Sequence, residues 1–240
     1  MILGLYVSIP DGKLRLVFCD VGQGDGALII RGNWQMMIDS GPDNGKMERC
    51  LDHYLPFWDK KIEGVMISHW DKDHSGALPK IMKSYGIDRL YESGVGSFEI
   101  EQKIYTEKLR AGDRVDYGEI DFEVIYPRDF GGGGNDNSLV IVLNYRDKKF
   151  IFTGDVDVNS EGEMMNWSFD HVEGIKIAHH GSDSGSGGEW LDRLTPAMAV
   201  ISVGQNNYGH PKEIILERLK DRGIKILRTD FRGDVVLGWD

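Results

Sequence analysis

The sequence of 240 residues lacks several features that define other classes of protein. No apolar run reaches the ~20 residues that a membrane-spanning helix needs. Two cysteines, Cys19 and Cys50, are too few for a disulfide framework, and Cys19 is expected in a buried strand, so the redox compartment stays open. The first nine residues, MILGLYVSI, lack the basic leading region and the small-residue cleavage site of a secretory signal peptide.

Positive charge is also scarce. The chain has 28 Lys and Arg against 39 Asp and Glu, which gives a net charge of -11. Because releasing counterions from phosphates requires clustered basic side chains, this balance argues against a general nucleic-acid coat protein. A polyanionic substrate would have to be held by metal ions or by a local basic rim.

What the sequence does contain is an ordinary globular composition, with 40% apolar and 10% aromatic residues. Apolar runs of strand length recur from Leu14 to Leu237. The helical patterns between them are fewer and lie at Lys46–Phe57, Ala77–Tyr85, Val158–Trp167 and Lys212–Arg222. This order predicts an α/β (α+β) fold, with two mixed β-sheets face to face and helices on the outer faces. We expect a single domain over residues 1–240, in which residues 1–13 form an edge hairpin or are the remnant of a longer segment.

The segment HWDKDH places four potential metal ligands directly after the apolar run VMIS. On an extended segment, residues two apart project to the same side, so His69, Asp71 and Asp73 can converge, while His74 begins the turn into a helix. Unpaired, each of these polar groups would cost about 1–3 kcal/mol, and metal ions would supply partners to all of them. The alternative is a solvated loop that caps the next helix. Trp70, inside the motif, is expected to face the core.

Two more clusters follow apolar runs. Asp155 ends the segment KFIFTGD, and His179 and His180 come directly after IKIA. Active sites built at strand ends along one edge of a sheet gather side chains from distant parts of the sequence. Each cluster is weak evidence by itself, but together with HWDKDH they predict a metal site.

Glycine-rich segments offer two interpretations. Gly131–Asp136 and Gly181–Gly188 are either flexible linkers or places where a ligand approaches the backbone closely. Gly22, Gly24 and Gly26 join two strand patterns, which favours a tight turn that exposes the backbone. No helix follows them, so a dinucleotide-binding fingerprint is not indicated.

The His-x-Asp-x-Asp-His motif, followed by TGD and then by HHGS, resembles the metallo-β-lactamase superfamily, and so does the segment LIIRGNWQMMIDSG. More narrowly, FCDVGQGDG, NSLVIVL, TGDVD, HHGSDSGS, ISVGQNNYGHP and RTDFRGDV resemble the C-terminal domain of ComEC-type DNA-internalisation competence proteins, from Leu14 to Leu237. The resemblance implies a metallo-β-lactamase-like αββα sandwich. It also implies that MILGLYVSIPDGKL leads from a membrane region into this domain.

The same resemblance implies a two-metal site. His69 and Asp71 would bind one ion, Asp73 and His74 the other, and Asp155 would bridge the two.

One of His179 and His180 would complete the shell of the second ion, and we favour His180, with His179 facing the substrate. The chain departs from the superfamily motif at Asp71, where the second histidine is expected. No histidine between the motif and TGD fills the middle ligand position, so Asn137 or water would stand in. Oxygen-rich coordination suits Mn²⁺ or Mg²⁺ better than Zn²⁺, so we expect two divalent ions, with Mn²⁺ favoured.

The resemblance implies a metal-dependent phosphodiesterase, a nuclease that hydrolyses DNA by attack of a bridging hydroxide. The predicted catalytic residues are Asp73, His179, Ser182 and His210, and Asn207 is a further candidate to bind the phosphoryl group. For His210 the alternative is a locally hydrogen-bonded residue at a helix entry.

The implied partners are DNA, as a single strand, and the membrane channel portion of the same or a partner protein, and we expect a monomer. The implied location is the extracytoplasmic face of the cell membrane, and otherwise the cytoplasm. One competing interpretation is a small-molecule phosphodiesterase resembling phosphorylcholine esterase. Another is a non-catalytic, metal-stabilised module that binds DNA or a partner, which the missing middle histidine supports. Acyl hydrolysis is less favoured, because the ligand set is rich in oxygen.

Overall fold

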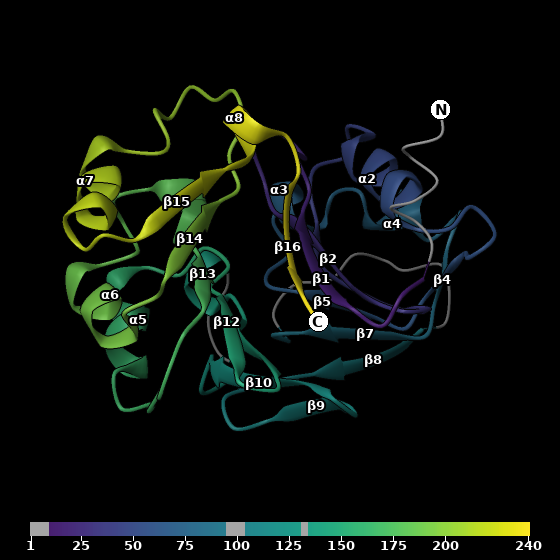
Figure 1. Ribbon diagram of the computed structural model, residues 1–240, viewed down its shortest axis with the longest axis horizontal. Helices are drawn as coiled ribbons and strands as arrows, with labels where there is room; N and C mark the ends of the chain where they lie inside the picture. Colours follow the sequence, from purple (N-terminus) through teal and green to yellow (C-terminus); the bar gives the residue numbers. More distant parts are fainter. Residues whose placement is uncertain (1–9, 95–103, 131–133) are drawn as a thin grey trace.

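The chain folds into two mixed seven-stranded β-sheets that pack face to face, with helices on the outer face of each sheet (Figure 1). The computed structural model describes residues 10–94, 104–130 and 134–240. This arrangement confirms the predicted αββα sandwich. It also leaves the termini of several strands from both sheets at one shared edge, where the site described below lies.

The first sheet combines an antiparallel and a parallel half. Its strands, in spatial order, are β16 (Val235–Trp239), β1 (Leu14–Phe18), β2 (Gly26–Arg31), β3 (Trp34–Ser40), β5 (Gly64–Ile67), β7 (Arg89–Glu92) and β8 (Tyr105–Lys108). The strands from β16 to β3 pair antiparallel, and those from β3 to β8 pair parallel. Both faces of this sheet are covered, which explains why β2 reads as a nearly continuous apolar run instead of an alternating one.

The second sheet has the same two-part construction. Its strands, in spatial order, are β15 (Lys225–Arg228), β14 (Met198–Ile201), β13 (Gly174–Lys176), β12 (Lys148–Phe152), β11 (Val140–Tyr145), β10 (Ile120–Tyr126) and β9 (Arg114–Tyr117). The strands from β15 to β12 are parallel, and those from β12 to β9 are antiparallel. A short third ladder pairs β4 (Lys61–Ile62) with β6 (Gly86–Ile87).

Helices cover the outer faces and are shorter than the sequence patterns predict. On the first sheet they are α2 (Lys46–Tyr54), α3 (Lys72–Ser75) and α4 (Leu78–Ile81), and on the second they are α5 (Val158–Met164), α6 (Gly188–Leu194) and α7 (Glu213–Asp221), with α8 (Thr229–Arg232) following β15 (Figure 1). Helix α2 ends before the predicted Phe57, because Leu55 precedes Pro56 and takes an extended conformation.

Three apolar clusters hold these layers together. The central cluster lies between the sheets and includes Phe18, Ile141 and Phe152. A second cluster packs the first sheet against α2 and α4, and a third packs the second sheet against α5, α6 and α7. Successive side chains on a strand point to opposite faces of the sheet, as the pleat requires. Leu16 therefore packs in the central cluster, and its neighbour Val17 packs in the cluster beneath the helices.

A disulfide joins Cys19, just past the end of β1, to Cys50 on α2, with the Cα atoms 6.0 Å apart. Cys19 is buried, as predicted, although it lies one residue beyond the strand. The bond therefore ties the glycine-rich turn after β1 to the helix layer.

The alternatives for the N-terminal segment concern chiefly residues 1–9, which lie outside those described, as do residues 131–133; residues 10–13 are described and contain no strand. Across the described ranges, no helix is both long and apolar enough to cross a membrane.

The disulfide closes a loop across a sequence separation of 31 residues. Restricting the unfolded chain in this way stabilises the folded state by about 3.7 kcal/mol. We expect the Cys19→Ala/Cys50→Ala double variant to lose about 3.7 kcal/mol of unfolding free energy in urea titrations. Dithiothreitol should lower the stability of the wild type similarly and leave the double variant unchanged. A wild type indifferent to reduction would contradict the cross-link.

Candidate metal centre

The candidate site lies where strands of the two sheets end at a common edge. His69 follows β5 of the first sheet, Asp155 follows β12 of the second, and His180 follows the neighbouring strand β13. Side chains at the carboxyl ends of such strands project into the space beyond the sheet. The three segments singled out in the sequence are thereby brought together.

Asp155 is the centre of this cluster. Its Oδ2 lies 3.2 Å from Nε2 of His74, 3.6 Å from Nε2 of His180, 3.7 Å from Nε2 of His179 and 4.0 Å from Nε2 of His69. Imidazoles from two sequence segments therefore point at one buried carboxylate. The position predicted for a bridging ligand is the position that the other side chains surround.

Glycines make this approach of the segments sterically possible. Gly154 has a φ of +54°, and a Cβ there would lie 2.7 Å from Cβ of Ser138. His179 and His180 both adopt the left-handed region, with φ of 48° and 53°, and Gly181 follows with a φ of +84°. Such conformations in residues other than glycine cost of order 1–3 kcal/mol each and persist only where the surroundings enforce them. Here they turn two consecutive imidazoles towards Asp155.

Several polar atoms of the cluster are buried without a hydrogen-bond partner among the described residues. They are Nε2 of His69, Nε2 of His74 and Oδ1 of Asp155. Each such atom costs about 1–3 kcal/mol unless something pairs with it. Asp25, His74, Asp155 and His180 each offer a ligand atom, and these atoms all lie within 4.8 Å of one another. The mixed imidazole and carboxylate set fits a divalent metal ion.

In two of the buried imidazoles, those of His74 and His180, Nδ1 is bound on the side that faces away from Asp155. Asp39 Oδ2 lies 2.9 Å from His74 Nδ1, and the carboxylate of Asp39 accepts from the backbone N–H and hydroxyl of Ser68, at 2.7 Å each. His180 Nδ1 lies 3.0 Å from the carbonyl oxygen of Ser202. These contacts fix the ring orientation and leave Nε2 of both imidazoles directed at Asp155, as in second-sphere support of metal ligands.

The pKa values of two buried imidazoles, His69 and His180, are shifted in opposite directions. Burial, together with the charge of His74, lowers the pKa of His69 to about 4, so this ring is neutral at pH 7. Burial alone would lower the pKa of His180, but Asp155 and Asp25 outweigh it and raise the pKa to about 9. Burial would likewise raise the pKa of Asp155, but His74 and His180 hold it well below its usual range.

Asp25 is a site residue that the sequence analysis missed. It lies in the turn between β1 and β2, and its Oδ1 is 3.3 Å from His180 Nδ1. It also forms an ion pair with Lys176, whose ammonium group is buried. Burial would raise the pKa of Asp25, but Lys176 and His180 reverse this and lower it. In the sequence the neighbouring glycines indicate only a tight turn. In the structure Gly24, which has no side chain, lets that turn pack against the backbone of Asp73, whose carbonyl oxygen accepts from the N–H of Asp25 at 3.1 Å.

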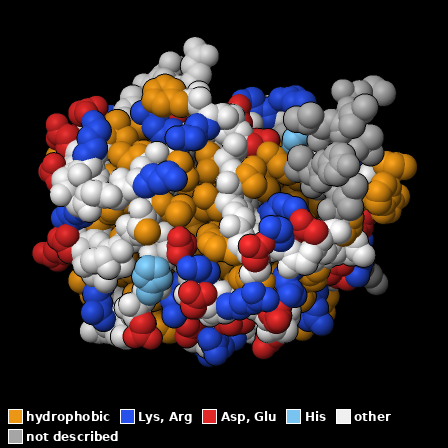
Figure 2. Space-filling model, viewed as in Figure 1, with side chains coloured by type: hydrophobic (Ala, Val, Ile, Leu, Met, Phe, Trp, Pro, Cys, Tyr) orange, Lys and Arg blue, Asp and Glu red, His pale blue; other side chains and the backbone are white. Residues whose placement is uncertain are grey.

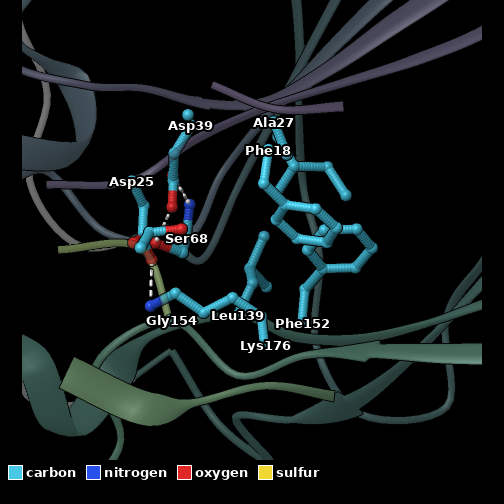
Figure 3. Close-up of a pocket in the computed structure, with 12 residues that line it drawn as sticks. Phe18, Asp25, Ala27, Asp39, Ser68, Leu139, Phe152, Gly154 and Lys176 are labelled. Carbon is cyan, nitrogen blue, oxygen red and sulfur yellow. Dashed lines mark hydrogen bonds and ion pairs between the residues drawn. The ribbon is translucent and has the colours of Figure 1, made fainter. Parts of the chain in front are cut away.

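Behind the cluster is a small internal cavity of about 10 Å³, enough for about one water molecule. Asp25, Asp39 and Ser68 line one side of it, and Phe18, Leu139 and Phe152 line the other (Figure 3). Lys176 reaches from the second sheet towards Asp25 across this space (Figure 3). The polar wall of this cavity is thus formed by the same side chains, Asp25 and Asp39, that contact the buried imidazoles from behind.

In front of the cluster is a cavity of about 230 Å³ that contains several of the predicted residues. It is lined by Gln23, Asp71, Asp73, Asn135, Asp155, His179, His180, Tyr208 and His210. Asp73 Oδ2 lies 3.3 Å from His180 Nε2, and Asp71 Oδ2 lies 3.8 Å from His69 Nε2. Asp71 is the more exposed of the two, with 55% of its side chain accessible against 39% for Asp73.

Other predicted residues do not line this cavity. The hydroxyl of Ser182 accepts from the backbone N–H and hydroxyl of Ser184, within its own loop. Asn207 is exposed on the loop before His210, and Asn137 is buried, while Asn135 from the same turn lines the cavity.

Trp70 packs partly against the cluster beneath α2 and α4, and its indole N–H donates to Glu92 at 2.6 Å. Its expected orientation towards the core is confirmed.

The sandwich and the donor set together define a class of protein. The model of the metallo-beta-lactamase superfamily matches residues 19–204, so the chain belongs to this superfamily. The chain is 29% identical over 258 residues to ComE operon protein 3 of Bacillus subtilis (strain 168), covering 94% of this chain and 33% of that protein. It is 26% identical over 237 residues to competence protein ComA of Neisseria gonorrhoeae, covering 96% of this chain and 33% of that protein.

These comparisons confirm the resemblance to ComEC-type competence proteins, and the chain spans about a third of the length of the curated relatives it matches. Among solved structures, the metallo-beta-lactamase fold protein YhfI from Bacillus subtilis has a TM-score of 0.64 at 10% sequence identity, covering 94% of this chain and 100% of that chain. That similarity confirms the fold.

The raised pKa of His180, about 9, predicts that metal binding is coupled to proton release. In the metal-free protein the shift stabilises the fold below pH 6.5, and this contribution is lost as pH rises through about 9. A cation that takes the imidazole must displace its proton, so affinity should increase with pH up to about 9. Calorimetry of Mn²⁺ binding in buffers of different ionisation enthalpy measures this release. Binding at pH 7 without proton release would contradict the assignment of His180 to the site.

Proposed function

We propose that this domain is a metal-dependent phosphodiesterase that hydrolyses DNA. The observation that carries the proposal is the convergence of four imidazoles on Asp155 at the base of a cavity of about 230 Å³. One relative, similar over 96% of this chain, is named a competence protein, which favours DNA as the polymer.

The residues that would hold divalent ions are His69, His74, His180 and Asp155, together with the carboxylates that face them. When bound, the ions would activate water at neutral pH and neutralise charge on the phosphoryl oxygens. Asp25, Asp71, Asp73 and Asp155 make the set rich in oxygen, and for this reason we favour Mn²⁺ over Zn²⁺ and two ions over one.

His179 is the residue we assign to the leaving oxygen. Of the four imidazoles around Asp155, His179 alone is substantially accessible, with 31% of its side chain exposed against 2% or less for the others. Its ring therefore lies between the buried ligands and the cavity. A group in this place can pass a proton to a departing alkoxide, which a fully buried ligand cannot.

His210 has a supporting place in the same cavity. Its ring centroid lies 5.7 Å from that of His179. Partial burial, followed by the charge of His179, lowers the pKa of His210. A neutral imidazole here can donate or accept one hydrogen bond to a phosphoryl oxygen or to its neighbouring histidine. We therefore assign His210 to substrate binding.

The net charge of -11 works against binding a free polyanion. On the face seen in Figure 2, basic side chains are interspersed with acidic ones and do not form a continuous stripe. We therefore propose weak, salt-sensitive affinity for free DNA, with the strand delivered by a membrane channel in the remainder of a longer protein. The acidic net charge is consistent with the competing substrate class, a small phosphodiester such as a phosphorylcholine ester.

We also propose that the domain faces the extracytoplasmic side of the membrane. The disulfide between Cys19 and Cys50 supports this location, since such bonds persist in oxidising compartments and are rare in the cytosol of mesophiles.

Replacing Asp155 with Asn tests the function. The substitution keeps the side-chain shape but removes the charge on which the imidazoles converge, and we expect hydrolysis of single-stranded DNA to fall at least about 1000-fold with Mn²⁺ present. The matched control is Asp183→Asn, an exposed loop carboxylate outside the cavity, which should retain wild-type turnover. The same assays use bis-p-nitrophenyl phosphate and a phosphorylcholine ester. Faster turnover of the choline ester than of DNA by the wild type would favour the competing substrate, and undiminished hydrolysis by Asp155→Asn would contradict a catalytic site here.

The metal preference has its own test. Protein stripped of metal with a chelator is resupplied with Mn²⁺, Mg²⁺ or Zn²⁺, and the rate of phosphodiester hydrolysis is measured for each. We expect Mn²⁺ to restore the highest rate, because carboxylate oxygens make up most of the donor set. Recovery with Zn²⁺ and none with Mn²⁺ would overturn the preference.

A further inference from the structure

A tyrosine at the rim of the cavity is left open to solvent. Tyr208 lines the cavity together with Asp73, Asp155 and His210, yet it is 69% exposed. A large aromatic side chain gains stability by covering its faces, and this ring is not part of any of the three apolar clusters. Its faces are available to a planar group of a molecule that enters the cavity.

The ring continues a series of aromatic side chains that rises from the cavity floor. Nε2 of His179 lies 3.7 Å from Asp155 Oδ2, the His210 ring centroid lies 5.7 Å from that of His179, and the Tyr208 centroid lies 5.7 Å from that of His210. The rings of Tyr208 and His210 are inclined by only 33°, so both present their faces in similar directions. A phosphodiester bound in this cavity would have its neighbouring nucleoside within reach of Tyr208, because Tyr208 lines the same cavity as Asp155.

The loop that carries Tyr208 is held in shape by one side chain. The carbonyl oxygen of the Asn206 side chain accepts from the backbone N–H groups of Tyr208 and His210, at 3.1 and 3.0 Å. Its amide group donates to the carbonyl oxygens of Gly204 and His210, both at 2.9 Å. The exposed ring is thus presented by an ordered loop, and binding would not have to order it first.

A basic group contacts the backbone of Tyr208, on a chain whose net charge is -11. The ammonium group of Lys212 donates to the carbonyl oxygen of Tyr208 at 2.7 Å. A cation next to an exposed aromatic ring is the combination that proteins use for the backbone and bases of a single strand. In a duplex the faces of each base are covered by stacked neighbours, so only an unpaired base can pack on such a ring.

We propose that Tyr208 is a stacking platform for an unpaired base adjacent to a phosphate bound in this cavity, which makes the domain selective for single-stranded nucleic acid. This inference rests on the proposed phosphodiesterase function and adds the residue that recognises the nucleoside. Stacking is tolerant of sequence, because every base has a π-face.

The experiment compares kcat/KM for an oligothymidylate with that for an oligomer of equal length in which abasic residues replace the thymidines. The wild type should prefer the oligothymidylate by about 5- to 150-fold, the range of one stacked base. Tyr208→Ala should lower turnover of the oligothymidylate by a similar factor and leave turnover of the abasic oligomer unchanged, whereas Tyr208→Trp should retain the preference. The control is Tyr105→Ala, a similarly exposed tyrosine that does not line the cavity, which should behave as the wild type.

The outcomes separate this inference from the function on which it rests. Equal turnover of both oligomers by the wild type would overturn the stacking platform and leave the phosphodiesterase intact. A parallel loss on both oligomers in Tyr208→Ala would assign the ring a merely structural role and would also overturn it. A wild type that cleaves neither oligomer with Mn²⁺ present would overturn the proposed function and the platform together.

Discussion

The burial of ionisable side chains around Asp155 is the constraint on which the rest of the structure depends. A buried charge is costly unless it is paired, and the free energy of folding must accommodate several here. The fold does so in layers: Asp155 faces the imidazoles, Asp39 and Ser202 hold the far sides of two rings, and Lys176 balances Asp25 in the interior. What these layers leave unpaired are the atoms directed at a common space, which a cation would satisfy.

The sandwich provides the geometry for this arrangement. Strand β5 belongs to the first sheet, and the neighbouring strands β12 and β13 belong to the second, so face-to-face packing of the sheets is what brings the end of β5 to the other two. The turn beyond β13 is strained, as the left-handed conformations of His179 and His180 show. Strain of this kind is tolerated when a large core holds the surrounding elements, and the cluster between the sheets supplies that support. The packing of the core between the sheets therefore also fixes the positions of the site residues.

Both the sandwich and most of the metal-site residues could be predicted from the sequence. Apolar runs predict the strands, and the polar residues that directly follow these runs predict the site. HWDKDH, TGD and HHG each follow such a run, and the structure brings all three together. The positions that sequence reasoning missed depend on contacts between distant elements. Lys176 is hidden inside the apolar pattern IKIA, and its partner Asp25 lies in a turn whose glycines indicate only that the turn is tight. Ser182 matches the family motif, yet its hydroxyl turns into its own loop, since the direction of a side chain in a loop is set by packing that a linear pattern does not contain.

Anomalous diffraction at the manganese absorption edge, from crystals grown with Mn²⁺, tests the central claim most directly. The account predicts strong anomalous peaks between Asp155 and the Nε2 atoms of His69, His74 and His180, and none of comparable height elsewhere on the described surface. An ordered cluster without any peak at millimolar Mn²⁺ would contradict it, and would leave these side chains as a buried polar network that stabilises an otherwise inactive sandwich.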